Sequence, residues 1–162
     1  MTQSSHRPRI GFAINDTRFV FWALMEQGAR ETALQINVKL EVYSAITASD
    51  QAAVVQNFVA ERVDALIIAP IGDQHPEFMA ALAAAKLARI PIITCESGYM
   101  QPLGFAKCDV RANLFLAAEV ATRHLVERID AQGQVLHISG TNSSPRAEGF
   151  TTVVAAHPAI QV

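Results

Sequence analysis

Short apolar runs alternate with longer segments of helical periodicity along most of this chain, and this alternation limits the folds open to it. The strand-like runs occupy residues 10–14, 38–43, 65–69, 91–95 and 105–108. Helical periodicity fills the intervals at residues 21–35, 51–62 and 76–89. Because the connections are short, successive strands must lie parallel and be joined by right-handed crossovers. The pattern therefore predicts an α/β fold with a doubly wound parallel sheet.

The strand-like runs differ in their side-chain patterns, and these patterns predict where each strand lies in the sheet. Residues 65–69 are continuously apolar, as in a central strand that is buried on both faces. Residues 38–43 alternate between apolar and polar side chains, which is typical of a strand with one face in water. We therefore expect residues 38–43 at an edge of the sheet.

The composition excludes several classes of protein. With 162 residues, 51% of them apolar and 17% charged, the chain is long enough and apolar enough to bury a sizeable core. A net charge of −2 gives no general attraction for nucleic acid or for anionic membranes. No apolar segment has the length of a membrane span, and the polar N-terminus lacks the apolar stretch of a signal peptide. Cys95 and Cys108 fit no zinc or redox motif and each ends an apolar run, so we expect two buried free thiols rather than a disulfide.

The turn after the first strand is the most unusual stretch of the sequence. A polar turn that includes Asp16 leads into a helix entrance that carries Phe19, Phe21 and Trp22. In an open parallel sheet, the turn that follows the carboxyl end of a strand opens onto the ligand crevice. Core packing explains one of these aromatic side chains easily, but a helix cannot bury adjacent positions equally well. We expect Phe21 and Trp22 to stack on a ligand rather than fill the core.

Charged side chains recur at other positions where a ligand would lie. Glu96 directly follows a buried strand and has no helix to cap, whereas turn and capping chemistry accounts for Asp73. Asp109 follows the next strand, and Arg146 stands in the first turn of a later helix, against the usual preference for anions there. Such an arginine either has an external partner or is simply exposed. The sequence shows no nucleophile–base pair and no cluster of metal ligands, so we expect neither an enzyme nor a cofactor.

The alternation continues in the last third of the chain but is short there. We expect a helix over residues 112–129, a strand over 135–139, a helix from 145 to about 157 and the start of a strand at 160–162. The chain is therefore divided into a first α/β lobe, residues 1–109, and the incomplete start of a second lobe, residues 110–162.

These residues together resemble the sugar-binding proteins of bacterial ABC importers, the ribose-binding type of the type I periplasmic binding proteins. The stretches that carry the resemblance are Ile10–Phe12, Phe21–Trp22 with Glu26–Ala29, Val63–Pro70, Ile90–Thr94 and Arg146–Phe150. They occur in the family's order and at its spacing, and they cover nearly the whole chain. The aromatic pair and the arginine motif are the more specific parts, because the middle stretches are framework.

The resemblance implies a role for each candidate residue. Phe21 and Trp22 match the aromatic side chains that sandwich the sugar ring in this family. Glu96 falls where the family usually has an aspartate that binds sugar hydroxyls, and Asp109 matches the acidic residue at the hinge between the lobes. Arg146 matches the arginine that reaches the ligand from the second lobe. The predicted ligand-binding residues are Asp16, Phe19, Phe21, Trp22, Glu96, Asp109 and Arg146.

The chain also departs from the family's pattern. Ser97 and Val110 replace an arginine and an asparagine that are common at these places, and Phe19 replaces a polar residue. These changes leave the identity of the ligand open. Family members have two lobes and a chain that returns to complete the first, so the resemblance implies a truncated chain with both lobes incomplete. We expect apolar side chains of the second lobe to need cover from outside it, namely Val135, Leu136, Ile138, Phe150 and Val153.

The resemblance implies a receptor that binds a monosaccharide or polyol and delivers it to the permease of an ABC transporter. Such a receptor is periplasmic, with its signal peptide absent from this chain, and it has no nucleic-acid partner and no direct membrane insertion. Two other classes of protein remain open. The sensing core of a lactose-repressor-type regulator, or another sugar sensor, shares the fold, although no helix-turn-helix precedes residue 9. An enzyme on a flavodoxin-like sheet would need a glycine-rich phosphate loop after the first strand, and this sequence has none there.

Overall fold

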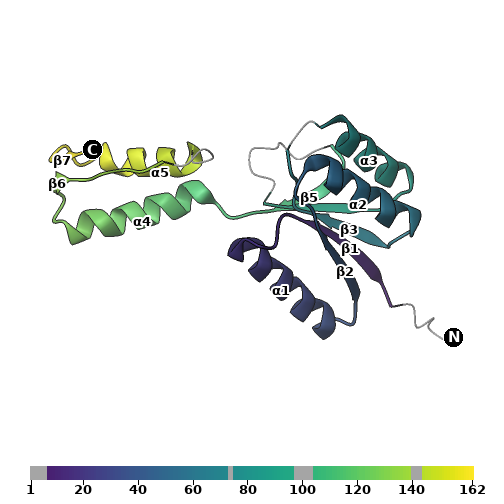
Figure 1. The fold of residues 1–162 in the computed structure, drawn as a ribbon. Helices are drawn as coiled ribbons and strands as arrows, with labels where there is room; N and C mark the ends of the chain where they lie inside the picture. The colour runs from purple at the N-terminus through teal and green to yellow at the C-terminus, as the bar shows by residue number, and fades with distance from the viewer. Residues whose placement is uncertain (1–6, 73–74, 97–103, 140–143) are drawn as a thin grey trace. The chain divides into compact units, whose positions relative to one another are not determined.

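The computed structural model describes residues 7–72, 75–96, 104–139 and 144–162 (Figure 1). The chain forms two compact units, Met1–Arg111 and Ala112–Val162. The assignment of residues 1–109 and 110–162 as two lobes of one binding protein stays a prediction. Asp73 and Ser97, which the sequence places in loops, lie outside the described residues.

A five-stranded parallel sheet is the framework of the first unit. Its strands are β1 (Arg9–Ile14), β2 (Lys39–Ser44), β3 (Ala65–Ile68), β4 (Ile92–Cys95) and β5 (Ala106–Val110). Their order in the sheet is β2-β1-β3-β4-β5, so β2 lies at an edge, as its alternating pattern predicts. The predicted fold class, an α/β fold with a doubly wound parallel sheet, is confirmed.

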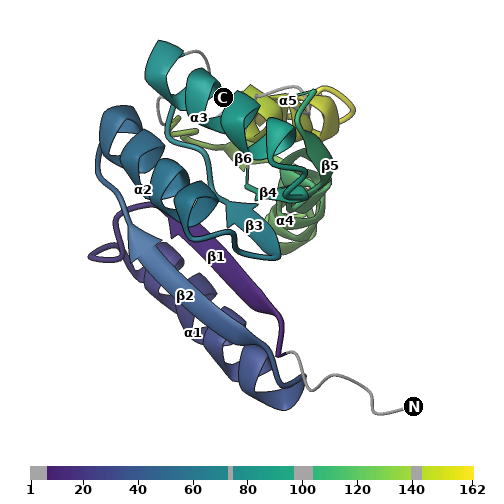
Figure 2. The ribbon, with the colours of Figure 1, turned by 90° about the vertical axis from the view of Figure 1, so that its right-hand side faces the viewer.

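Three helices connect the first four strands and cover both faces of the sheet. They are α1 (Val20–Gln35), α2 (Ala48–Ala60) and α3 (Pro76–Leu87). Figure 2 shows α1 on one face of the sheet and α2 and α3 on the other. Each helix follows the carboxyl end of a strand, so the amino ends of all three helices lie at the carboxyl edge of the sheet. This edge is where a ligand of an open α/β sheet binds.

The larger core lies between the sheet and the helices α2 and α3. Its fully buried side chains include Phe58 of α2, Leu66 of β3 and Phe78 of α3. Gly11 of β1 faces the ring of Phe58, and a Cβ atom at Gly11 would lie 2.6 Å from the ring carbon Cγ. Glycine at this position therefore lets α2 pack closely on β1.

A second, smaller core lies on the face that α1 covers. Phe12 and Ile14 of β1, together with Ala69 and Cys95, are buried there. Trp22 is among the partly buried side chains of α1 that pack against this cluster. The strand β1 is therefore buried on both faces, as a continuously apolar run predicts.

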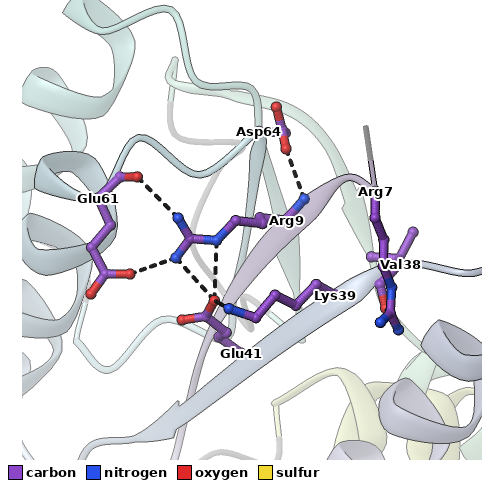
Figure 3. Close-up of polar contacts among 7 residues, drawn as sticks. All are labelled: Arg7, Arg9, Val38, Lys39, Glu41, Glu61 and Asp64. Atoms are coloured by element: carbon purple, nitrogen blue, oxygen red, sulfur yellow. Dashed lines mark hydrogen bonds and ion pairs between the residues drawn. The ribbon is translucent and has the colours of Figure 1, made fainter. Parts of the chain in front are cut away.

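Arg9 ties β1 to β2 and to the end of α2 at the amino edge of the sheet (Figure 3). Its guanidinium donates to Oε1 of Glu41 from Nη2 at 3.0 Å and to Oε2 of Glu61 at 2.8 Å. Nζ of Lys39 lies 2.9 Å from the same Glu41 oxygen, and the backbone N–H of Arg9 donates to Asp64 at 2.7 Å. Hydrogen bonds from Lys39, which has the larger effect, and from Arg9 hold the pKa of the Glu41 carboxyl below its usual range.

This lowered pKa predicts an acid-sensitive contribution to stability. The charged form of Glu41 is favoured in the folded chain, so its stabilisation is present above the ordinary glutamate pKa of about 4.3 and is lost as the pH falls through the lower, folded value. At neutral pH we expect Glu41→Gln to reduce the free energy of unfolding by about 1 kcal/mol, since the network is partly exposed. In urea unfolding, the difference from the parent chain should shrink as the pH falls below the ordinary glutamate pKa and vanish once the carboxyl is protonated in the folded chain.

Glu31→Gln is the matched control, because the Glu31 carboxylate accepts a hydrogen bond from a neutral side chain, Gln27. It should change the unfolding free energy little at any pH. A Glu41→Gln difference that persists unchanged into acid would contradict the prediction.

In the second unit, two helices pack against each other beside a two-stranded parallel ladder. Its elements are α4 (Leu114–Arg128), β6 (Gly133–Gln134), α5 (Ser144–Val154) and β7 (Ile160–Gln161). Gly149 of α5 faces α4 so closely that an added Cβ atom would collide with the carbonyl oxygen of Phe115. Val126, Val153 and Ile160 form the small core of this unit.

The predicted strand over residues 135–139 is wrong in its position. The observed β6 covers Gly133–Gln134, and the N–H of Val135 donates to the carbonyl of Gln161 at 2.8 Å, which is the last bond of the ladder. Among the described residues, none pairs with 136–139, and apolar alternation without a neighbouring strand forms no ladder. Leu136 and Ile138 are 85% and 84% exposed.

The expectation that five apolar side chains need cover from outside the second unit is wrong for two of them. Val153 is buried in the small core of the unit. Phe150 is also buried, and its ring stacks on His137 with the ring centres 4.2 Å apart. The unit thus covers its helical stripe itself and packs Val135 partly against its core, and it leaves Leu136 and Ile138 exposed.

Candidate ligand-binding site

A turn at the carboxyl end of β1 brings a carboxylate and a guanidinium together. The Asp16 carboxylate accepts a hydrogen bond from the backbone N–H of Arg18 at 3.0 Å and is bound by its guanidinium at 2.6 Å from Nη2. These bonds from Arg18 lower the pKa of Asp16, so the carboxyl is ionised at neutral pH. Arg18 is otherwise exposed to solvent. Arg18 is not among the residues predicted from the sequence, although an aspartate in a turn often accepts a hydrogen bond from the backbone two residues further on.

The three aromatic side chains after this turn have different surroundings. Phe19 precedes α1 with an extended backbone and is 65% exposed, and Phe21 in the first turn is 54% exposed. Trp22 is partly buried and packs against the smaller core. Its ring meets that of Phe21 edge-on, with the centres 4.8 Å apart and the planes at 82°.

Phe21 is thus exposed, whereas Trp22 packs partly against the smaller core. Adjacent residues on a helix point in directions about 100° apart, so one of the pair turns toward the sheet while the other stays at the surface. Trp22 holds the position of the Phe21 ring through the edge-on contact. Contact of either ring with a ligand stays a prediction.

Glu96 directly follows β4 in a backbone conformation that few residues adopt. Its φ angle is +47°, in the left-handed region, which costs of order 1 kcal/mol for a residue with a side chain. Its N–H donates to the carbonyl of Val110 at 2.9 Å, so the turn begins while the chain is still bonded to β5. Such strain is common at binding sites, where the surrounding structure fixes it.

Asp109 in β5 is held by its own chain. One of its carboxylate oxygens accepts a hydrogen bond from the hydroxyl of Thr94 at 2.9 Å, and the other lies 3.4 Å from Nε of Arg111. Thr94 is buried in β4, and the Asp109 side chain is mostly buried. The carboxylate therefore ties the two strands together where the first unit ends. Neither partner was identified from the sequence. Arg111 is a near neighbour along the chain, whereas Thr94 becomes adjacent to Asp109 only through the register of β4 and β5.

Arg146 lies in the second unit, exposed in the first turn of α5. In the same turn, the hydroxyl of Ser144 donates to Glu148 at 2.8 Å. Arg146 belongs to a different unit from the other candidate residues. Its role in binding stays a prediction.

The two cysteines are free, and they differ in exposure. Cys95 is buried, whereas Cys108 is exposed because it lies in the edge strand β5. The predicted pair of buried thiols is thus correct for Cys95 and wrong for Cys108. Burial first, and then the charges of Glu96 and Asp109, raise the pKa of the Cys95 thiol to about 12.

This difference predicts the order in which the thiols react. At pH 8 the Cys95 thiol stays protonated and buried, and only the thiolate form of a cysteine is a nucleophile. Iodoacetamide should therefore modify Cys108 first and Cys95 only when the chain unfolds. Mass spectrometry of peptides after timed labelling, with and without urea, measures both rates. Equal rates in the folded chain would contradict the structure.

Two of the helix amino ends at the carboxyl edge are already occupied by acids of the chain itself. Asp50 caps α2 through a reciprocal pair of hydrogen bonds with Thr47, each 3.1 Å long. Glu77 lies in the first turn of α3 and accepts a hydrogen bond from Ser49 at 2.5 Å. These carboxylates repel a second anion, so the edge is better suited to a neutral ligand than to a phosphate.

Two further properties concern only the described part of the chain. No group of three or more His, Cys, Asp or Glu side chains in the described ranges is arranged to hold a metal ion. None of the helices in those ranges combines the length and the apolar character that crossing a membrane requires.

A parallel α/β unit whose carboxyl edge carries exposed aromatic and charged side chains is typical of proteins that bind small molecules. The chain belongs to the family described as "Periplasmic binding protein domain", which matches residues 10–162. Comparison with known proteins thus gives the same family as the motifs in the sequence.

Similar proteins of known structure include ABC-transporter solute-binding proteins. The protein from Actinobacillus succinogenes, crystallised with bound D-allose, is 27% identical with a TM-score of 0.80, over 96% of this chain and 57% of that one. The protein from Agrobacterium vitis, bound to α-D-tagatopyranose, is 26% identical with a TM-score of 0.71, over 96% and 56%. A Rhizobium meliloti protein named as a candidate rhizopine-binding protein is 24% identical over 91% of this chain and 48% of its own length. The chain therefore spans about half the length of these relatives.

Proposed function

We propose that this chain carries part of the ligand-binding site of a solute receptor for a sugar or polyol. The observation that carries the proposal is the exposure of Phe19 and Phe21 beside the ionised Asp16 and the Arg18 guanidinium at the carboxyl edge of the sheet. A pyranose ring has apolar C–H faces on which aromatic rings stack, and hydroxyls around its edge that bind carboxylates and guanidinium groups. One turn of this chain offers both kinds of partner.

The candidate residues have distinct parts in the proposed site, and Phe19 adds a second exposed aromatic face beside Phe21. Phe21 stacks on the sugar ring, and Trp22 supports it from the core side. Asp16 and Glu96 accept hydrogen bonds from hydroxyls, while Arg18, held in place by Asp16, donates to ring or hydroxyl oxygens.

Asp109 fixes the end of the first unit. Arg146 contacts the ligand from the second unit, as the family resemblance implies.

The proposed ligand is neutral and is bound without chemical change. The occupied helix ends described above favour an uncharged ligand, and binding of a sugar needs no proton transfer. The relatives from Actinobacillus succinogenes and Agrobacterium vitis are solute-binding proteins of ABC transporters, which supports a role in binding over catalysis. By the same relationship we propose a periplasmic location and a transporter permease as partner. This reading is favoured over a transcription regulator, because both relatives serve transport.

Titration of the 162-residue chain with single sugars tests the proposal. The probes are D-allose, L-arabinose, D-tagatose, D-fructose and myo-inositol, followed by NMR amide shifts, which detect dissociation constants as weak as about 1 mM. We expect at least one probe to shift the amide signals of residues 15–22 and Glu96. The Actinobacillus succinogenes protein with D-allose is the positive control. No shift with any probe, or conversion of a bound sugar into a product, would reject the proposal.

A further inference from the structure

A buried glutamine joins the two central strands of the sheet at the carboxyl edge. Gln51 of α2 is fully buried, with 0% of its surface exposed. Its Nε2 donates to the carbonyl of Ala69 at 2.8 Å and to that of Ala13 at 3.4 Å. Its Oε1 accepts the N–H of Ile71 at 2.9 Å. One side chain therefore bonds the end of β1, the residue after β3 and the loop that follows.

The backbone at this place needs such a side chain. The ladder between β1 and β3 ends with the N–H of Ala69 donating to Ala13 at 2.9 Å, and beyond it the two strands continue into separate loops. Ala69 is fully buried, so water does not satisfy its carbonyl. A carboxamide offers a donor and an acceptor at once, whereas methionine has no donor and only a weakly accepting sulfur, and an ionised carboxylate cannot donate. A buried polar group costs free energy unless it is bonded, and Gln51 is bonded at both ends.

We propose that Gln51 is a positioning residue, which fixes the spacing of the loops after β1 and β3 at the edge of the candidate site. Ala13 precedes Asp16 by three residues, and the same turn leads directly to Phe19 and Phe21. On its other side, the end of β1 is held by the N–H of Ala45, which donates to Ile14 at 2.9 Å. Gln51 supplies the matching restraint on the β3 side. The consequence for ligand affinity rests on the proposed function, whereas the consequence for loop order does not.

Gln51→Met tests the proposal, because it keeps the volume of the side chain and removes its hydrogen bonds. The matched control is Val55→Ala, which makes a cavity one turn further along α2 in the larger core. Both variants should lower global stability. Only Gln51→Met should speed amide hydrogen exchange at Ile71 by tenfold or more beyond the change at Leu66, a core amide in β3. Unchanged protection of Ile71 relative to Leu66 would overturn the proposal.

Gln51→Glu adds a readout that a simple packing role would not give. Burial raises the pKa of a carboxyl group, so the glutamate is protonated below its folded pKa and ionised above it. The protonated form has an O–H that donates to Ala69 while its other oxygen accepts from Ile71, whereas the ionised form repels the Ala69 carbonyl. We expect Ile71 protection near that of the parent chain at acidic pH, and its loss as the pH rises. If the protection of the Ile71 amide in Gln51→Glu did not depend on pH, this would count against a role for the hydrogen bond that Gln51 donates to Ala69.

A D-allose titration of the same variants links loop order to binding. If the parent chain binds D-allose, Gln51→Met should raise the dissociation constant at least fivefold under conditions in which it is fully folded, while Val55→Ala leaves it unchanged. Equal affinities for the parent chain and Gln51→Met would overturn the link to the site. If the parent chain binds none of the sugars, the proposed function fails, and the exchange of Ile71 still decides whether Gln51 positions the loops.

Discussion

Gly11→Ala is expected to destabilise the first unit by about 2 kcal/mol, the middle of the range for overpacking a core. The added Cβ atom would lie 2.6 Å from Cγ of Phe58. Neither partner can move aside easily. Gly11 is in β1, which is paired on both sides by β2 and β3, and Phe58 is fully buried in the larger core with its ring against that of Tyr43. Urea unfolding followed by circular dichroism gives the free energy.

Gly28→Ala is the matched control for this substitution. Gly28 is in the interior of α1, and apart from its chain neighbours and the nearby backbone of its own helix no atom lies within 4 Å of the position that a Cβ would take. The same chemical change should therefore stabilise the chain there by about 0.5–1 kcal/mol, through the better helix propensity of alanine. If Gly11→Ala lowers the free energy of unfolding and Gly28→Ala raises it, the loss at Gly11 comes from the contact with Phe58 and not from the intrinsic effect of replacing glycine by alanine. A neutral or stabilising Gly11→Ala would show that β1 and α2 do not pack as described.

Trp22→Ala and Phe21→Ala are expected to separate stability from binding at two adjacent residues. Trp22 packs against the smaller core, so its loss should reduce the free energy of unfolding by about 2–3 kcal/mol, less than for a fully buried tryptophan. Phe21 is more than half exposed, and its loss should change stability by less than about 0.5 kcal/mol. Both should weaken sugar binding by about 1–3 kcal/mol, because Phe21 provides the stacking face and Trp22 holds it.

Thermal unfolding and NMR titration with D-allose measure the two effects on the same samples. Leu24→Ala is the control, since Leu24 is exposed on α1 close to the pair and has no part in the proposed stacking. Leu24→Ala should change neither the unfolding temperature nor the dissociation constant for D-allose by much. If Phe21→Ala destabilised the chain as strongly as Trp22→Ala, or left the affinity unchanged, Phe21 would belong to the core and not to the site.

The order and type of the elements in the first unit follow from the sequence alone. The predicted strands at 10–14, 65–69 and 91–95 agree with β1, β3 and β4 to within one residue at each end. The reason is that hydrophobic periodicity is local: each segment shows by itself whether alternate, successive or helically spaced side chains are buried. The edge position of β2 was predictable for the same reason.

The candidate site was predicted in part. The turn with Asp16, the exposed Phe19 and Phe21, and Glu96 after β4 all stand at the carboxyl edge, because strand direction alone places them there. Their partners were not predicted. Arg18 was overlooked beside Asp16, while Thr94 reaches Asp109 only through the register of two strands.

Only the tertiary structure decided which side chains, apolar or polar, are covered by another segment of the chain. Trp22 packs against the cluster beneath α1 that contains the buried Cys95, whereas Phe21 and Cys108, similar in type, are left at the surface. Leu136 and Ile138 have the pattern of a strand but no partner strand among the described residues. In the sequence, Gln51 is an ordinary polar helix residue. Its hydrogen bonds form only where α2 packs over the ends of β1 and β3. A pattern within one segment records its own periodicity, but burial and hydrogen bonding depend on residues far away in the sequence, which meet only when the chain folds.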